Sequence, residues 1–187
     1  MRARAMPQRP GAGALAQRLA QILRVDHAGE LGAVQIYRGQ RAVFDASPAH
    51  ARISGQLAEM EAHEAHHLAR FEALLTETPV RPTLFSPLWR AAGFALGAGT
   101  ALMGERAAHA CTEAVESVIE AHYAGQVEEL RERRPDLATE LAIFRDEELA
   151  HKDQAVAEGA RSAPGYPVLA AVIRTGCRAA IKLSEWV

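Results

Sequence analysis

The chain has 187 residues, a net charge of −2, 49% hydrophobic residues and 24% charged residues, which is ordinary for a soluble globular domain. This length suffices for one domain with a substantial core, or for two small repeats that share one. The charge gives no general case for nucleic-acid binding, and no such partner is expected. Cys111 and Cys177 form no CxxC pair, so both are expected to be buried apolar residues in a reducing compartment.

Helical periodicity predicts six helices, and no segment alternates as a strand would. Residues 1–13 are basic but lack the apolar run of a signal peptide, so they are predicted to be a disordered leader before a single domain at 14–187. Ser47 and Pro48 are predicted to cap and begin the second helix. The predicted helices span 14–45, 48–77, 88–104, 105–133, 136–159 and 167–186. The chain is therefore predicted to be all-α.

The two halves of the chain repeat one another. "ELGAVQIYRGQ" after residue 29 matches "ESVIEAHYAGQ" after residue 115, and "EAHH" in the first half corresponds to "ELAH" in the second. Each half then has a proline-containing turn and an apolar helix. The repeats, at about 20–104 and 105–187, predict two pseudo-symmetric helical hairpins that form a ferritin-like four-helix bundle, each with one appended helix.

A set of carboxylates and imidazoles recurs at matching positions of the two repeats. Each repeat has a lone glutamate and then Glu-x-x-His, whose side chains share one helix face. The six residues are Glu30, Glu64, His67, Glu116, Glu148 and His151. This is the ligand pattern of a di-metal carboxylate bundle, and oxygen ligands with imidazoles and no thiolate favour iron or manganese over zinc. A chain of this composition contains about one Glu-x-x-His by chance, so the specificity lies in the order and the symmetry.

Other polar residues lie beside the predicted ligands. Glu113 and Glu120 share a helix face with Glu116, but only Glu116 has a carboxylate counterpart in the first repeat, so these two are interpreted as solvated or supporting carboxylates. Tyr37 and Tyr123 lie seven residues after their glutamates. They are interpreted either as core aromatics or as candidate catalytic residues beside the metals that order a bridging carboxylate or line a substrate cavity.

Ligating histidines normally donate their second N–H to a carboxylate or a carbonyl. Asp26 and Glu147 are candidates for this role, and the sequence does not choose between them. His63 is a further candidate beside the first pair. His66 is expected at the surface, because it is turned by about 100° from a ligand.

Two segments suggest contact with a membrane surface. The uncharged run from Ala91 to Gly104 has 14 residues, which is too short to span a bilayer. Arg174, Arg178 and Lys182 form a basic stripe on an otherwise apolar helix, which is typical of an interfacial helix. The alternative is a helix that packs on its own bundle with its arginines outward. The paired apolar helices would also suit a homodimer.

Four segments resemble the demethoxyubiquinone hydroxylase family closely. They are "RVDHAGELGAVQIYRGQ", "RPTLFSPLWRAAGFALGAGTALMG", "FRDEELAHKD" and "VIRTGCRAAIKLSEWV". The resemblance covers nearly the whole chain after residue 20. It implies a ferritin-like bundle with two iron ions, whose ligands match the six residues above. Glu113 and Glu120 add acidic residues that depart from the family's pattern, but neither is one of the six predicted ligands.

The resemblance also implies an activity. Such an enzyme uses O2 to hydroxylate the ring of a polyprenyl demethoxyubiquinol, late in ubiquinone biosynthesis. It would lie peripherally on the cytoplasmic face of the cell membrane, alone, as a homo-oligomer or in a biosynthetic complex. No flavin or dinucleotide motif is present, so the electrons are expected from an external donor or from the quinol. Gly29 and Gly32 beside Glu30 would serve a close helix approach or make room for a flat ring.

Two other functions remain open at the level of sequence. A ferritin-like ferroxidase or peroxidase would share the metal ligands but has no use for paired apolar helices. A metal-free helical membrane-adaptor protein would keep those helices but has no need of six converging ligands.

Overall fold

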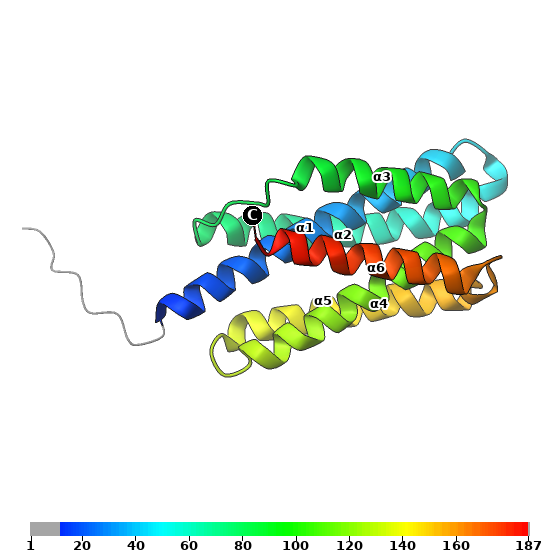
Figure 1. Ribbon diagram of the computed structural model, residues 1–187. Helices are drawn as coiled ribbons and strands as arrows, with labels where there is room; N and C mark the ends of the chain where they lie inside the picture. Colours follow the sequence, from blue (N-terminus) through cyan, green and yellow to red (C-terminus); the bar gives the residue numbers. More distant parts are fainter. Residues whose placement is uncertain (1–11, 187) are drawn as a thin grey trace, which may run out of the picture.

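The computed structural model describes residues 12–186, and its six α-helices confirm the all-α prediction (Figure 1). The predicted leader lies largely outside the described residues, and its separation from a single domain stays a prediction. The helices are α1 (Ala12–Phe44), α2 (Ala51–Glu77), α3 (Ser86–Leu102), α4 (Glu105–Leu130), α5 (Pro135–Ala157) and α6 (Tyr166–Ser184).

The helix boundaries follow local chemistry. A 3₁₀ turn, Pro48–His50, precedes α2, and the Ser47 side chain caps this turn by accepting a hydrogen bond from the Ala49 N–H. The second helix therefore begins at Ala51, three residues later than predicted. Gly159 adopts a left-handed conformation with φ of 90° just beyond α5, which a residue with a side chain rarely adopts.

Four helices form the bundle and two lie along its side. α1 packs against α2, and α4 packs against α5, which gives the two predicted hairpins. α3 runs along α1 and α6 runs along α4, so each hairpin carries its appended helix at a corresponding place (Figure 1). This arrangement agrees with the predicted ferritin-like bundle of two pseudo-symmetric repeats.

Apolar residues fill the bundle on both sides of a polar middle. One cluster gathers residues from the first half of α1, the end of α2, the end of α4 and the start of α5, including Leu23, Phe71 and Leu141. The other gathers the end of α1, the start of α2 and the start of α4, including Phe44, Leu57 and Ala108. The polar residues between these clusters are thereby shielded from water.

Glycines allow α1 and α3 to approach closely. A Cβ atom added at Gly97 would collide with the carbonyl oxygen of Ile36, and one added at Gly39 would collide with that of Phe94. The backbones of the two helices therefore touch directly. Within residues 12–186, no helix combines the length and the apolar composition that a membrane span requires.

Candidate metal centre

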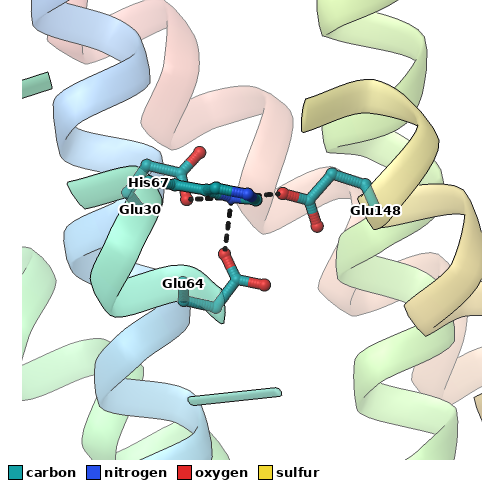
Figure 2. A group of neighbouring side chains, drawn as sticks. All are labelled: Glu30, Glu64, His67 and Glu148. Carbon is teal, nitrogen blue, oxygen red and sulfur yellow. Dashed lines mark ion pairs between the residues drawn. The ribbon is translucent and has the colours of Figure 1, made fainter. Parts of the chain in front are cut away.

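The structure brings all six predicted ligands together in the polar middle of the bundle. α1 supplies Glu30, α2 supplies Glu64 and His67, α4 supplies Glu116, and α5 supplies Glu148 and His151. Two overlapping groups result, and in each group one ligating atom from every member lies within 4.8 Å of the others. The first group is Glu30, Glu64, His67 and Glu148 (Figure 2), and the second is Glu64, Glu116, Glu148 and His151. Glu64 and Glu148 belong to both groups, which is the position of a bridging carboxylate.

Both histidines turn Nδ1 toward the carboxylates. His67 Nδ1 lies 3.2 Å from Glu148 Oε1 and 3.5 Å from Glu30 Oε2. His151 Nδ1 lies 3.0 Å from Glu64 Oε1 and 3.6 Å from Glu148 Oε2. His67 Nδ1 also lies 3.7 Å from Glu64 Oε2, so both imidazoles face the two shared carboxylates, Glu64 and Glu148, and His67 faces Glu30 in addition.

The inner atoms of this cluster lack hydrogen-bond partners although they are buried. Each of the six side chains has at least one such oxygen or nitrogen atom, and all six side chains are 5% exposed or less. Buried polar groups are nearly always paired, because an unpaired one costs about 1–3 kcal/mol or more if charged. Four carboxylates also match the charge of two divalent ions. The residues present therefore fit a pair of metal ions.

Without a metal, the cluster must hold protons. Burial, together with repulsion from neighbouring carboxylates, raises the pKa of Glu30 and Glu116 well above the usual value. Burial lowers the pKa of His151, but the nearby carboxylates of Glu148 and Glu64 outweigh it and raise this pKa to about 9. Burial raises the pKa of Glu64, but the nearby imidazoles of His151 and His67 bring it down to about 2. Metal binding would release the bound protons.

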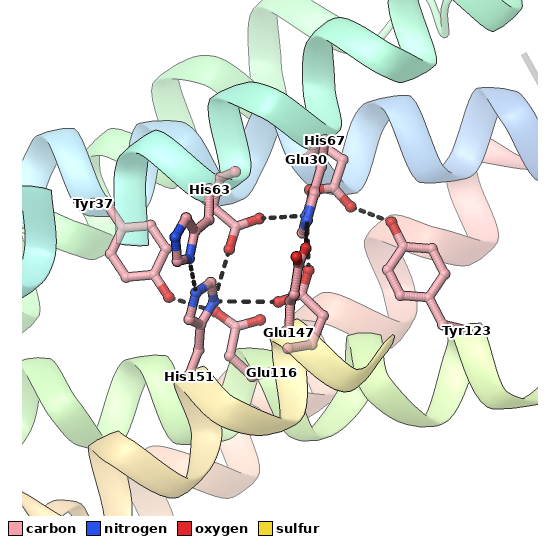
Figure 3. A network of polar contacts seen from close by, with 10 residues as sticks. Glu30, Tyr37, His63, His67, Glu116, Tyr123, Glu147 and His151 are labelled. Carbon is pink, nitrogen blue, oxygen red and sulfur yellow. Dashed lines mark hydrogen bonds and ion pairs between the residues drawn. The ribbon is translucent and has the colours of Figure 1, made fainter. Parts of the chain in front are cut away.

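The two tyrosines predicted beside the metals contact the lone glutamates crosswise. Tyr37 Oη donates to Glu116 Oε1 at 2.6 Å, and Tyr123 Oη donates to Glu30 Oε1 (Figure 3). Each tyrosine thus serves the glutamate of the other repeat, because α1 and α4 run antiparallel through the site. Both rings are buried. Each contacts a glutamate that belongs to one ligand group and not Glu64 or Glu148, which both groups share, so a role in ordering a bridging carboxylate stays a prediction.

The outer nitrogens of the histidines have two different partners. His67 Nε2 lies 2.5 Å from Glu147 Oε2, so Glu147 takes the supporting role that the sequence left open. His151 Nε2 lies 3.0 Å from His63 Nδ1 (Figure 3). His66 is exposed, as predicted.

Asp26, the other candidate partner for a ligating histidine, contacts Gln126 and His122 instead. The Gln126 amide donates to Asp26 Oδ1 at 2.8 Å, and His122 Nε2 lies 3.3 Å from the same oxygen. Gln126 was not recognised from the sequence as a partner of Asp26. The sequence does contain a signal for Gln126, because a Gly-Gln pair recurs at matching positions of the two repeats. The counterpart of Gln126 in the first repeat is Gln40, which donates a hydrogen bond to the carbonyl of Ala108.

The two acidic neighbours of Glu116 lie outside the ligand groups. Glu113 is buried and accepts two hydrogen bonds from Arg174, at 2.7 and 2.9 Å, and one from Tyr166 at 3.0 Å. Glu120 is partly exposed and pairs with Lys152 at 2.9 Å. Arg174 thus binds a residue of α4. The predicted basic stripe of α6 therefore lacks one of its three members.

An apolar cavity of about 400 Å³ lies between α1, α4, α3 and α6. Gly29 and Val115 line it, and each directly precedes a predicted ligand, Glu30 or Glu116. The cavity and the carboxylate cluster therefore lie on neighbouring faces of the same stretches of α1 and α4, since adjacent residues of a helix are turned by about 100°. Its remaining walls come from α3 and α6.

Gly29 and Gly32 serve this cavity rather than a close helix approach. A Cβ atom added at either position would have no heavy atom within 4 Å, and both residues line the cavity. The close approach of α1 and α3 depends instead on Gly39, Gly93 and Gly97.

Comparison with known proteins identifies the family. Residues 17–184 match the family model described as ubiquinone biosynthesis protein COQ7. The chain is 48% identical over 180 residues to the 3-demethoxyubiquinol 3-hydroxylase of Rhodospirillum rubrum, covering 96% of this chain and 82% of that protein. It is 47% identical over 169 residues to the human mitochondrial NADPH-dependent 3-demethoxyubiquinone 3-hydroxylase, covering 88% and 76%.

A more distant relative carries a similar name. The mitochondrial 5-demethoxyubiquinone hydroxylase of Saccharomyces cerevisiae is 40% identical over 182 residues, covering 89% of this chain and 77% of its own. The resemblance inferred from the four sequence segments is thereby confirmed. The chain belongs to the COQ7 family of ubiquinone-biosynthesis hydroxylases.

Proposed function

We propose that this protein is an O2-dependent di-iron monooxygenase that hydroxylates the ring of a polyprenyl demethoxyubiquinol. The observation that carries the proposal is the juxtaposition of two features across α1 and α4. One is a cluster of six buried ligating side chains with unpartnered atoms. The other is an apolar cavity on the neighbouring face of the same helices, lined by the residues directly before Glu30 and Glu116.

The six side chains would hold two iron ions. Glu30 and His67 would serve one ion, Glu116 and His151 would serve the other, and Glu64 and Glu148 would bridge them. Oxygen and imidazole donors without thiolate suit iron, with manganese as the nearest alternative. When bound, the metal pair supplies the activation of O2 that ring hydroxylation requires.

The protein's own part is to exclude water and to orient the ring. Phe71 and Phe144 belong to the apolar cluster that flanks the ligands, and Phe144 stacks on His67 with 4.1 Å between ring centroids. The glycines at 29 and 32 leave room for a planar ring against α1. A polyprenyl tail would leave between α3 and α6.

The surface of α3 and α6 suits a lipid bilayer, which is where a polyprenyl quinol resides. Nine of the eleven exposed large apolar side chains of the described residues lie on these helices or on residues directly beside them. They are Leu84, Leu88, Phe94, Leu102, Met103, Val168, Val172, Leu183 and Trp186. Arg178 is exposed beside them and would contact anionic headgroups. The protein would lie on the cytoplasmic face of the membrane without crossing it.

A vesicle experiment tests this membrane surface. We expect the protein to float with vesicles that contain phosphatidylglycerol and to be released by the double substitution Leu84→Glu/Val168→Glu. The control is the double substitution Ile143→Glu/Leu149→Glu on α5, which places the same two charges on exposed apolar residues away from α3 and α6. Equal vesicle binding by both variants would contradict the assignment of the surface.

The alternatives differ in their need for these features. A ferroxidase or peroxidase would use the ligands but not the apolar cavity. A metal-free adaptor would have no need of four carboxylates and two imidazoles that converge in its core. An external reductant or the quinol itself would supply electrons, and a homodimer through α3 and α6 or a biosynthetic complex stays a prediction.

Ligand substitution tests the enzyme directly. We expect Glu148→Ala and His151→Ala to lose roughly 10²-fold or more in hydroxylation and to bind fewer than two irons per chain. The measurements are ubiquinone production in a host that lacks this hydroxylation, and iron content of the purified protein. Asp153→Asn, an exposed charge removal on the same helix, should keep both. Ubiquinone production by either ligand variant at the level of the unsubstituted protein would contradict the assignment.

A further inference from the structure

The two ligating histidines are supported by chemically different groups. His67 Nε2 lies 2.5 Å from a carboxylate oxygen of Glu147. His151 Nε2 lies 3.0 Å from the imidazole Nδ1 of His63, whose ring is nearly parallel to it at 12° (Figure 3). One histidine therefore has an anionic partner and the other has an imidazole.

This difference stands out because the rest of the site is matched by the internal repeat. Glu30 corresponds to Glu116, Glu64 corresponds to Glu148, and the two tyrosines bind the lone glutamates crosswise. The supporting groups also occupy one equivalent position, directly before Glu-x-x-His. The first repeat has His63 there, and the second repeat has Glu147.

One further difference lies beside the same histidines. Phe144 stacks on His67, whereas the equivalent position of the first repeat holds Met60. The apolar ring shields the His67 side further from water. Substitutions at position 63 leave this contact in place, so they isolate the effect of the supporting group.

The proton positions follow from the direction of the ligating atoms. A histidine that binds a metal through Nδ1 keeps its proton on Nε2 and donates it outward. The carboxylate of Glu147 accepts a hydrogen bond from this N–H, which makes the His67 ring a stronger donor to a metal. A neutral His63 accepts at Nδ1 and polarises His151 less. The affinities of the two positions should differ accordingly.

We propose that the two metal sites are inequivalent: the site with His67, supported by Glu147, binds its ion more tightly and fills first, and the site with His151, supported by His63, fills second. His63 and Glu147 are positioning residues, because each acts through a ligating histidine. The inference rests on the metal pair of the proposed function. It adds an order of loading, and it makes the His151 site the one from which an ion is lost first.

Titration of the metal-free, full-length protein with Mn²⁺ alone tests this order. Removing a supporting partner typically changes metal affinity 10–100-fold, so the first ion should bind roughly 10–100-fold more tightly than the second. Calorimetry gives the two affinities. Electron paramagnetic resonance should show an isolated Mn²⁺ signal up to one equivalent, and this signal should diminish as the second ion couples to the first.

Substitutions at the two supporting positions assign the sites. His63→Glu should tighten the second ion until the two affinities differ by only a few-fold. His63→Gln, which keeps a neutral acceptor, should preserve the gap. Ala62→Glu is the matched control, because it adds the same charge at the adjacent exposed position. Glu147→Gln should weaken the first ion, whereas Asp153→Asn should not.

The outcomes separate this inference from the proposed function. Two ions of equal intrinsic affinity in the unsubstituted protein would overturn the inference and leave the metal pair intact. A shift caused by His63→Glu that is no larger than the shift caused by Ala62→Glu would overturn it too. A protein that binds no ion would overturn the metal centre itself.

Discussion

Gly29 and Gly32 stand on either side of Glu30, yet only the glutamate faces the carboxylate cluster. The two glycines border the apolar cavity, where an added Cβ would meet nothing within 4 Å. At Gly97 the opposite holds, because an added Cβ would collide with the backbone of α1. The same residue type thus provides free volume at one place and helix contact at another, and substitutions distinguish the two roles.

We expect Gly32→Ala to raise the free energy of unfolding by about 0.5–1 kcal/mol, because alanine fits the space and favours the helix. Gly32→Leu should reduce hydroxylation at least tenfold and leave iron content unchanged, because the longer side chain fills the cavity. Gly97→Ala should lower the free energy of unfolding by about 1–3 kcal/mol. Urea unfolding, iron analysis and turnover measure these effects, and equal loss of iron and activity in Gly32→Leu would point to packing alone.

At the scale of elements, α6 is attached to the bundle by an ion pair between a partly exposed arginine and a buried glutamate. Glu113 lies in the middle of α4, three residues before a predicted metal ligand, and Arg174 reaches it from α6 with two hydrogen bonds. The interfacial interpretation of α6 assigned Arg174 to a basic stripe at the membrane. Its side chain is 30% exposed and is turned to α4 instead, so this pair helps to hold one wall of the cavity in place.

Arg174→Met should lower the free energy of unfolding by about 1–3 kcal/mol, because it leaves Glu113 buried with only Tyr166 as a side-chain partner from α6. This expected loss in the free energy of unfolding is smaller than that for breaking a fully buried ion pair, because Arg174 is partly exposed. The double substitution Glu113→Leu/Arg174→Met should recover most of the loss. Lys182→Met is the control on the same helix, since its exposed pair with Glu185 should contribute less than about 0.5 kcal/mol.

On the scale of the whole molecule, the carboxylate cluster places charge in the middle of a bundle that is otherwise held together by apolar contacts. Without metal, the fold depends on protons bound by this cluster. The raised pKa values of Glu30, Glu116 and His151 all contribute stability at low pH that is lost as the pH rises. The lowered pKa of Glu64 acts in the opposite direction, but its contribution is lost only as the pH falls from its usual value toward about 2.

The metal-free protein should therefore become less stable between about pH 6.5 and pH 9, the range over which His151 loses its proton in the unfolded and then in the folded state. His151 alone accounts for a loss on the order of 3 kcal/mol. The iron-loaded protein should show no such loss, because its ligands are already deprotonated. Urea unfolding of both forms across this range measures the difference, and a metal-free protein that gained stability with pH would refute the expectation.

The sequence by itself determined the helical fold and the set of residues that meet in its centre. Periodicity identified six helices, and the spacing of Glu-x-x-His assigned each pair to one helix face. The internal repeat then distinguished Glu116 from Glu113 and Glu120. These inferences succeeded because they depend on local geometry and on symmetry within the chain, both of which can be read without knowing how the helices pack.

Only the tertiary structure decided which groups face one another across helices. Periodicity gives the face of a helix but not its neighbour, so the crossed contacts of Tyr37 and Tyr123 and the pairing of Arg174 with Glu113 could not be read from the chain. Which carboxylates belong to both ligand groups, Glu64 and Glu148, also could not be read from the chain, because this depends on how the helices pack. Glycine has no side chain to indicate its surroundings, so the roles of Gly32 and Gly97 became distinct only when the space around each was known.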